Sequence, residues 1–587
     1  MDLEEVMSSR GNTVIAAVIA LLFIGAYVLY RQSLPKPLPT IPFNAASAAS
    51  VLGDGLDMAR TVAATGEFGP WCAAQIEKVG APICQVFVQP FAKPWVLVAD
   101  YRESYDILAR RTAPSRDADF DKSSFITGNM SCLGEFHAAF MATKTGDAFR
   151  SHRALIQDLM TPSFLHGVMA PVVYGKALEL VALLEAKMRL SGGRPFSARA
   201  DLDCLAMDVM LYFAFGEYYN KTSLGPQTEI IANLTTADMP GGQIDEPVPF
   251  PEAPAGDFVD AVRAAPGVVE ACINSLFPRL SLWWWQKQSW YKKIFSQRDH
   301  VLSEQFAKAL EAYRGGKIHS GAEHMLMRAE REAEKQGRNL DLEAVALGDE
   351  LFGNMIAGNH TTGGMLGWIV KALTIYSGHQ AKLRATLYAA LPDAYAEDRA
   401  PTVEELRRAR LPYLDAFIEE TMRLNPVPVT RETIRDTTIL GHPVPKGCQV
   451  FLVSNGPGFL SPSPSPTPVA LSDYSTKARV VKTNDHWDEE RDLRTFDPER
   501  WLVRINGGDD GTFEFNGAAG PQLVFGHGIR GCWGKRLAQM ELRTVTALLV
   551  WHFELLGIPE VLAGNGATEG VARRPRQVIV RLKKVVR

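Results

Sequence analysis

A lone cysteine in a glycine-rich turn carries the strongest chemical signal in the sequence. Cys532 lies within FGHGIRGCWGKR, residues 525–536, and the apolar run that follows it predicts a helix. Near a helix N-terminus, free N–H groups and the helix dipole stabilise a thiolate. Such a thiolate can act as a nucleophile or as a metal ligand, although a lone cysteine is more often a small buried residue. Arg530, two residues upstream, can pair with an anionic group of a cofactor.

A second chemical signal interrupts an apolar helix. AGNHTT, residues 357–362, lies in a run with helical spacing that extends from about residue 343 to 376. Thr361 follows Ala357 by four residues and Gly358 by three, so these residues share a helix face. The Thr361 hydroxyl can bond an upstream carbonyl and loosen the helix. His360 can shuttle protons near neutral pH, or it can point into solvent or bond a neighbouring helix.

These segments resemble the motifs of the cytochrome P450 superfamily. The turn around the cysteine matches the haem-binding signature FxxGxRxCxG at every fixed position. ETMR, residues 420–423, matches the ExxR motif, and FDPERW, residues 496–501, resembles the PERF motif. AGNHTT stands where the family has its oxygen-binding helix, and FRSHR, residues 149–153, stands where it has WxxxR. The chain is similar to eukaryotic microsomal members, most of all to fungal ones.

The resemblance implies a haem b cofactor (iron protoporphyrin IX), with Cys532 as the axial ligand of its iron. Donation from the thiolate to iron favours cleavage of the O–O bond. The two haem propionates need cationic partners, and family positions point to three arginines. Further contacts are implied for residues beside the cysteine and on the oxygen-binding helix. The implied cofactor-binding set is Cys532, Arg530, Arg153, Arg431, Phe525, Gly528, Ala357 and Gly358.

The resemblance also implies a proton relay on the oxygen-binding helix. Thr361 would steer protons to the bound oxygen, and a neighbouring acid would feed it. His360 holds the place of that acid, so it either joins Thr361 as a catalytic residue or is a bystander. Ala357 and Gly358 are then expected to be small because oxygen and porphyrin come close to them.

Two further departures from the family pattern affect the expected contacts. Phe149 replaces the tryptophan of WxxxR and lacks its N–H donor. One propionate is therefore expected to lose a protein donor or to take a water instead. Trp501 replaces the phenylalanine of PERF, which we expect to be a small change.

Three charged residues are expected to form a buried network rather than a reaction centre. Glu420 and Arg423 lie three residues apart on one helix face. The family's third partner is the PERF arginine, here Arg500. Such a network specifies a fold more than it stabilises it, so we expect these residues to be structural.

The rest of the chain, which must position these groups, is mostly helical in its pattern. Short strand-like runs occur near residues 83–100, near residue 448 and at the C-terminus. We therefore expect a mainly α fold with a small β-sheet region toward the N-terminal side. With the motifs, this is the cytochrome P450 haem-thiolate fold, preceded by an N-terminal transmembrane helix.

The N-terminus predicts a membrane anchor. Residues 13–30 are free of charge and, at ~1.5 Å per residue, extend far enough to cross a thin bilayer. A cleaved signal peptide is the alternative, although acidic residues precede the apolar run and no small-x-small site directly follows it. We expect an anchor at 1–30, a proline-rich linker at 31–43 and a catalytic domain at 44–587. A Ser/Pro-rich surface insert is expected at about 457–485.

Composition excludes several other classes of function. The formal net charge of −4 gives no indication of a nucleic-acid partner. The seven cysteines are scattered and form no CxxC pair, which argues against a disulfide framework or a zinc site. The motifs use most of the chain after the anchor, and no flavin or nicotinamide fingerprint is present, so electrons must come from a separate protein.

The sequence thus indicates an oxidoreductase, a cytochrome P450 monooxygenase that receives electrons from an NADPH–cytochrome reductase. It would use dioxygen to oxidise a lipophilic small molecule, in a role compatible with secondary metabolism. Its expected location is the endoplasmic reticulum membrane, as a single-pass protein whose catalytic domain faces the cytosol. One alternative is a haem-thiolate isomerase or dehydratase that rearranges a peroxide without a reductase. The other is a non-catalytic haem-binding protein.

Overall fold

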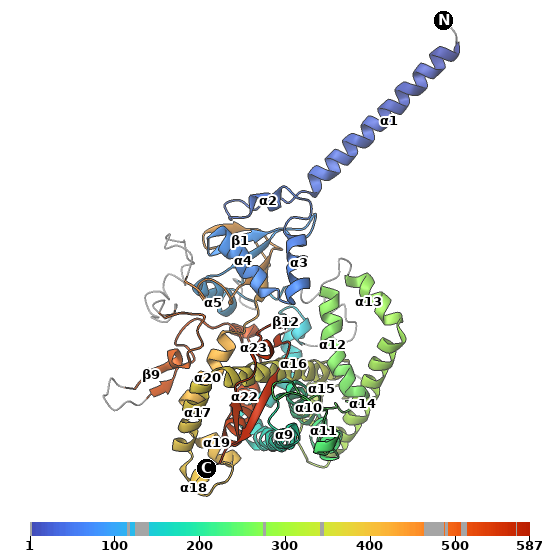
Figure 1. Cartoon of the computed structure of the whole chain (residues 1–587). Helices are drawn as coiled ribbons and strands as arrows, with labels where there is room; N and C mark the ends of the chain where they lie inside the picture. The colour runs from blue at the N-terminus through green and yellow to red at the C-terminus, as the bar shows by residue number, and fades with distance from the viewer. Residues whose placement is uncertain are drawn as a thin grey trace.

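The computed structural model describes residues 3–113, 118–123, 140–273, 278–340, 345–462, 487, 491–505, 513–570 and 572–586. The described chain is mainly helical, and the long helix α16 (Val345–Ile375) crosses the middle of the body (Figure 1). The other helices are α1 (Leu3–Ser33), α2 (Ala45–Ala48), α3 (Gly55–Thr65), α4 (Gly69–Val79), α5 (Tyr101–Ala109), α7 (Asp147–Ile156), α8 (Pro162–Phe164), α9 (Ala170–Ser191), α10 (Arg199–Phe215), α11 (Leu224–Ala232), α12 (Asp257–Ile273), α13 (Pro278–Lys287), α14 (Ser289–Arg314), α15 (Gly321–Lys335), α17 (Ser377–Ala390), α18 (Pro392–Ala396), α19 (Val403–Arg408), α20 (Pro412–Arg423), α22 (Lys535–His552) and α23 (Glu560–Ala563).

The largest sheet joins the N-terminal part of the chain to residues more than 300 positions later. Its strand order is β1-β2-β8-β5-β3, with β2 and β8 parallel and the other neighbours antiparallel. Its first two strands are buried on both faces. Strand β2 is apolar throughout, and the polar Gln85 of β1 donates to the Leu38 and Ile41 carbonyls. The strands are β1 (Ile83–Val86), β2 (Trp95–Val98), β3 (Phe120–Asp121), β5 (Val429–Thr433) and β8 (Gln449–Leu452).

Smaller sheets complete the β structure. A three-stranded sheet has the order β11-β14-β4, and the described residues also form three two-stranded pairs. The sheet consists of β4 (Phe196–Ser197), β11 (Phe553–Leu556) and β14 (Ile579–Lys584). The pairs are β6 (Thr437–Ile439) with β7 (His442–Val444), β9 (Leu502–Arg504) with β10 (Phe513–Phe515), and β12 (Ala567–Glu569) with β13 (Arg573–Pro575).

Helix α16 is apolar over most of its length because other elements cover it closely. Helix α10 packs along it, and β13 lies against its later turns. A Cβ added to Gly363 would lie 2.7 Å from Asp203 Oδ1, and one on Gly367 would lie 3.0 Å from Pro575 Cγ. Glycine at these positions therefore allows the neighbouring backbones to approach. This packing places residues 357–362 in the centre of the molecule.

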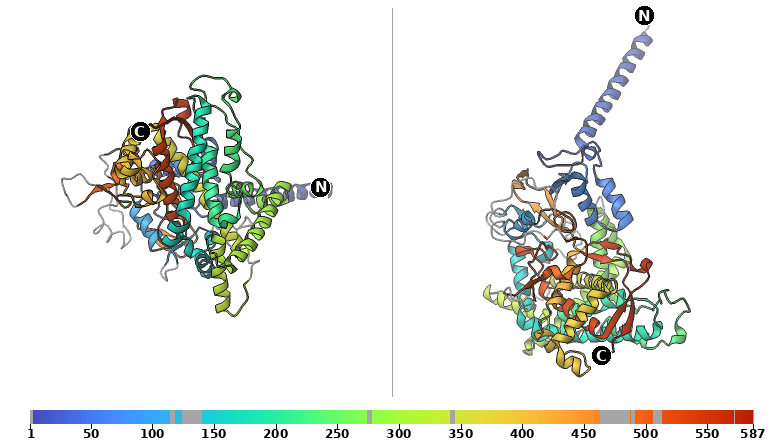
Figure 2. Two further views of the ribbon diagram at one scale, coloured as in Figure 1. Left: turned by 90° about the horizontal axis from the view of Figure 1, so that it is seen from below. Right: turned by 60° about the vertical axis from the view of Figure 1, so that its left-hand side comes forward.

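Helix α1 projects alone from the body, as Figures 1 and 2 show. Its apolar side chains from Val18 to Tyr30 are largely exposed. Within the described residues, the stretch long and apolar enough to cross a bilayer is Pro162–Ser191, which is partly buried in the fold. Ala17–Ser33 is apolar but shorter.

The expected elements and the observed ones agree in most places. The strand-like runs became β1, β2, β8 and β14, and the predicted long helix became α16. The C-terminal strand β14 belongs to a separate sheet, away from the sheet that holds β1 and β2. Most of the predicted insert at 457–485 lies outside the described residues.

Candidate active site

The loop that carries Cys532 is a tight turn in front of helix α22. The Cys532 N–H donates to the Phe525 carbonyl at 2.7 Å, which closes the turn. Gly528 has a φ of 68°, and a Cβ there would lie 2.3 Å from the Leu108 carbonyl oxygen. Only glycine fits this conformation and this approach. The loop therefore holds the thiol three residues ahead of Lys535, where α22 begins.

Cys532 differs from the other cysteines in the described part of the chain. It is exposed, whereas Cys72, Cys84, Cys204 and Cys448 are buried. Burial raises the pKa of the thiol, and the N–H groups of Gly534 and Lys535 oppose that shift. The fold alone therefore does not make a thiolate, and a coordinated metal ion would be needed to hold the thiol deprotonated.

Arg530 is fixed by neighbours that the motif did not reveal. Its Nε donates to Thr145 Oγ1 at 2.7 Å, and an Nη donates to the Thr143 carbonyl at 2.8 Å. The guanidinium also stacks over the Phe149 ring, with Cζ 3.8 Å from the ring centroid. Phenylalanine at the WxxxR position thus supports Arg530 by cation–π contact. Burial lowers the pKa of Arg530 to about 10, yet it remains a cation at neutral pH.

Arg431 is a buried cation with part of its guanidinium unused. It lies on β5, donates to Thr112 Oγ1 at 3.3 Å and donates to the Thr430 carbonyl at 2.8 Å. One Nη nitrogen is buried and has no hydrogen-bond partner among the described residues. Burial, with the nearby charge of Arg530, lowers its pKa to about 10. Buried polar groups are nearly always paired, so this nitrogen indicates a missing anionic ligand.

Arg153 lies on α7 and connects the cysteine to the long helix. Burial lowers its pKa, while the charges of Cys532 and of Glu350 on α16 oppose the shift. The residue before it, His152, contacts Glu350 with Nδ1 3.0 Å from the carboxylate. Glu350 is fully buried. The contact between His152 and Glu350 therefore joins α7 to α16 next to Arg153. It helps to hold the Arg153 guanidinium near the Cys532 thiol.

The AGNHTT segment adopts part of the expected geometry. Thr361 Oγ1 donates to the Ala357 carbonyl at 2.7 Å, so the hydroxyl bends back along the helix as predicted. The small size of Gly358 also has a cause within the chain. A Cβ on Gly358 would lie 2.3 Å from the Met210 sulfur of α10. The close approach of α10 therefore explains the small size of Gly358.

His360 faces a positively charged neighbourhood. Burial lowers its pKa to about 4, and the charges of Arg574 on β13 and Arg199 on α10 add to the shift. Its buried Nδ1 has no hydrogen-bond partner in the described part of the chain. At neutral pH only about one imidazole in a thousand is protonated. His360 is thus neutral at pH 7. Its expected role as a proton shuttle would therefore have to start from the neutral imidazole.

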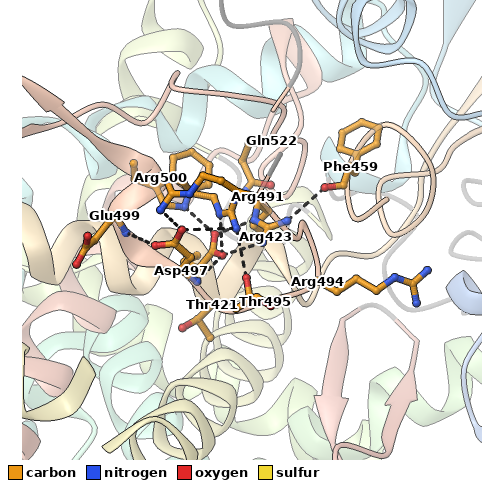
Figure 3. Close-up of polar contacts among 12 residues, drawn as sticks. Thr421, Arg423, Phe459, Arg491, Arg494, Thr495, Asp497, Glu499, Arg500 and Gln522 are labelled. Atoms are coloured by element: carbon orange, nitrogen blue, oxygen red, sulfur yellow. Dashed lines mark hydrogen bonds and ion pairs between the residues drawn. The ribbon is translucent and has the colours of Figure 1, made fainter. Parts of the chain in front are cut away.

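The predicted Glu420–Arg423–Arg500 network is fully formed, as Figure 3 shows in part. Arg423 makes two hydrogen bonds of 2.7 Å to Glu420, and Arg500 Nε donates to it at 3.1 Å. The Asp497 backbone N–H donates to Glu420 Oε1 at 2.9 Å. Trp501 Nε1 also donates to Glu420 at 2.9 Å. The expectation that tryptophan here is a small change was wrong, because the indole supplies a hydrogen bond that phenylalanine cannot.

The structure thus brings the predicted groups into two places. Cys532, Arg153, Arg530 and Arg431 gather around the loop before α22, while Glu420, Arg423 and Arg500 form a separate network. An exposed thiol, several buried cations and an unpaired guanidinium nitrogen suit a flat metal cofactor that carries carboxylates. The sequence missed Thr143, Thr145 and Glu350 as supports, because each is distant in the chain from its partner.

Comparison with known proteins agrees with this arrangement. The chain matches the cytochrome P450 family over residues 81–456 and 488–579. This match covers most of the chain, so the protein belongs to the cytochrome P450 family. Its members use haem b, and the residues described above fit that cofactor.

The similar proteins include several fungal enzymes. The cytochrome P450 monooxygenase xilC of Penicillium rubens is 37% identical over 566 residues, which cover 96% of this chain and 95% of that protein. The monooxygenase TRI13 of Fusarium sporotrichioides is 32% identical over 594 residues, covering 97% and 98%. The steroid 21-hydroxylase of Bos taurus is 25% identical over 376 residues, covering 64% and 62%. The enzyme class, an oxidoreductase of the P450 monooxygenase type, is thereby confirmed.

Proposed function

We propose that the protein is a haem-thiolate monooxygenase of fungal secondary metabolism that oxidises a lipophilic small molecule. The observation that carries the proposal is the exposed Cys532 thiol in a turn that matches the haem-binding signature, with Arg153 beside it. Haem b, when bound, supplies the activation of dioxygen and its transfer to substrate. The similarity to fungal monooxygenases along the whole chain supports the same conclusion.

The chain's own residues then have distinct tasks. Cys532 would hold the iron through its sulfur, and Arg153, Arg431 and Arg530 would hold the propionates. The Thr361 hydroxyl, which now donates to the Ala357 carbonyl, can rotate to present a proton toward the oxygen site. His360, neutral at physiological pH, can accept a proton on Nδ1 or relay one through water.

Electrons would come from a separate NADPH–cytochrome reductase. Lys535 and Arg536 are exposed directly after the cysteine turn, and this positive surface suits an acidic partner. Helix α1, with exposed apolar side chains from Val18 to Tyr30, would anchor residues 1–30 in the endoplasmic reticulum membrane. The linker at 31–43 would then hold the catalytic domain, residues 44–587, on the cytosolic side.

One experiment tests the monooxygenase assignment. The purified protein is reduced under carbon monoxide and its Soret band is recorded. Turnover of candidate substrates is then measured with and without NADPH and reductase. The expected result is a thiolate-type carbonyl band with turnover that requires both NADPH and reductase. A carbonyl spectrum without the thiolate signature would contradict the assignment.

The isomerase or dehydratase alternative is favoured by one observation, the replacement of the relay acid by a neutral His360. Such an enzyme rearranges a peroxide and needs neither reductase nor proton delivery. The retained Thr361 hydroxyl argues against it. Full turnover of a hydroperoxide with no reductase present would support the alternative over the monooxygenase.

A further inference from the structure

A lysine that belongs to none of the family motifs lies within the cation group around the cysteine turn. Lys122 directly follows strand β3, which pairs antiparallel with β5. The register pairs Phe120 with Thr433 and Asp121 with Glu432. Lys122, one residue beyond this pairing, therefore lies close to Arg431, whose charge acts on it. Two cations are thus held next to each other.

Such a pairing is unfavourable on its own. Two like charges close together repel each other, and burial increases the penalty because the dielectric constant falls. The pKa of Lys122 is lowered to about 7 by burial first, and then by the charges of Arg530 and Arg431. The Arg431 guanidinium is itself buried and has an unused Nη nitrogen. The two cations therefore share a need for negative charge.

The charges around Lys122 can be compared directly. Asp121 is the carboxylate, within the described residues, whose charge acts on Lys122, Arg431 and Arg530 alike. Its Oδ1 lies 3.9 Å from an Arg530 Nη. With Lys122 protonated, three cations beside one carboxylate leave an excess of two positive charges, which equals the charge that two propionates would balance.

Two other cations nearby, Arg153 and Lys144, do not add to this excess of positive charge, because each has its own carboxylate. Arg153 has Glu350 as a nearby negative charge. Lys144, although close to Lys122, is exposed and pairs with Glu432 at 3.0 Å. Glu432, which follows Arg431 on β5, is thus already paired with a cation outside the group.

We propose that Lys122 is a fourth cationic partner of the haem propionates and takes the place of the donor that Phe149 cannot supply. This inference rests on the proposed haem-thiolate function. In proteins with the WxxxR motif the tryptophan indole N–H is a donor. Phe149 has no such donor, and its ring instead packs against the Arg530 guanidinium, with Cζ 3.8 Å from the ring centroid. The Lys122 ammonium offers three donors on a flexible stem and is close enough to Arg431 and Arg530 for their charges to lower its pKa. Bound propionates would restore its charged state, because opposite charge favours the protonated form.

The test compares Lys122→Met with two matched variants. Lys144→Met removes an exposed, already paired ammonium from the same region, and Lys122→Arg keeps the positive charge. Ferric protein is mixed with excess apomyoglobin, and the rate of haem transfer is followed by absorbance. Losing a charge-assisted hydrogen bond should speed haem release about tenfold in Lys122→Met. Lys144→Met and Lys122→Arg should stay within about twofold of the wild type.

A second readout reports on the propionates themselves. The propionate bending bands in the resonance Raman spectrum should shift in Lys122→Met and stay unchanged in Lys144→Met. If Lys122→Met does not accumulate as folded protein, Lys122→Gln serves the same measurement. Unchanged bands together with a release rate within about twofold of the wild type would overturn the inference. A wild-type protein that binds haem without a thiolate carbonyl band would instead contradict the proposed function, and the propionate measurement on ferric protein would still decide the role of Lys122.

Discussion

Two buried clusters in this protein contain the same kinds of charged side chain and differ in how that charge is balanced. In the network around Glu420, one carboxylate accepts five hydrogen bonds, from Arg423, Arg500, Trp501 and the Asp497 backbone. In the cluster beside Cys532, three cations surround Asp121, and the Arg431 guanidinium keeps a buried nitrogen without a partner. The first cluster is complete within the chain, and the second is complete only with an anionic ligand.

This difference separates a structural network from a binding site on physical grounds. A buried charge is tolerated when its hydrogen bonds and counter-charges are present. Where they come from the chain, substitutions should change folding. Where they come from a cofactor, substitutions should change cofactor binding and leave the fold largely intact. The predictions below test this division.

The largest effect is expected for Cys532→Ala. Without the sulfur the iron has no axial thiolate, so the variant should lose the thiolate-type carbonyl band completely. The measurement is the absorbance spectrum of the reduced protein under carbon monoxide. Cys448→Ala is the matched control, because Cys448 is buried and lies in β-sheet surroundings distant in sequence from the turn. An unchanged band in Cys532→Ala would refute the ligand assignment.

Glu420→Gln should chiefly affect folding. The change leaves Arg423 and Arg500 buried without a full counter-charge, at a cost of about 3–5 kcal/mol in the free energy of unfolding. Urea unfolding followed by tryptophan fluorescence measures this loss. Arg431→Met provides the comparison, since it removes a cation from the unbalanced cluster and should mainly speed haem release. Equal losses of unfolding free energy in Glu420→Gln and Arg431→Met would contradict the distinction between a structural network and a cofactor site.

Trp501→Phe tests whether the indole is part of the structural network. The variant restores the family's usual residue and removes one hydrogen bond to a buried carboxylate. We expect the free energy of unfolding to fall by about 1.5–3 kcal/mol, the usual range for hydrogen bonds to charged groups. Trp551→Phe is the control, because its Nε1 donates at 3.0 Å to the neutral Arg399 carbonyl. A smaller loss in Trp501→Phe than in Trp551→Phe would count against the interpretation.

Much of the fold was predictable from the sequence, and particular contacts were not. Apolar periodicity predicted α16, and short strand-like runs predicted β1, β2 and β8, because these signals are local. The turn with Cys532 was identified from a contiguous motif. The pairing of β3 with β5 was not predictable, since it joins residues 120–121 to residues 432–433. Lys122 was missed for that reason, as its meaning depends on the cations that this pairing brings close.

Some contacts made by motif residues could not be predicted from the motifs themselves. Phe149 was expected only to lose a donor, yet its ring supports the Arg530 guanidinium. Gly358 is expected on the oxygen side of the haem, and it also lies where Met210 of α10 leaves no room for a Cβ. In each case the sequence identifies an unusual residue, and a neighbour distant in the chain adds a contact that the motif does not show.

His360 should give the smallest effect, one confined to coupling between electron use and product. We expect His360→Asp to retain haem and to change product formed per NADPH by more than about twofold, because general acid–base groups influence proton transfer strongly. His360→Asn is the matched control, since it stays polar and neutral but has no titrating ring nitrogen. If neither variant changes coupling, His360 is a bystander, and the proton route runs through Thr361 and water alone.

The pH dependence of coupling sharpens the same question. Because the pKa of folded His360 is lowered from 6.5 to about 4, the residue should not titrate between pH 6 and 8, and coupling should show no transition from it there. A transition near pH 6.5 that disappears in His360→Asn would contradict the lowered pKa. Between about pH 6.5 and 4, the unfolded chain binds a proton at His360 that the folded chain does not. Stability should therefore fall as the pH drops through that window, and less so in His360→Asn.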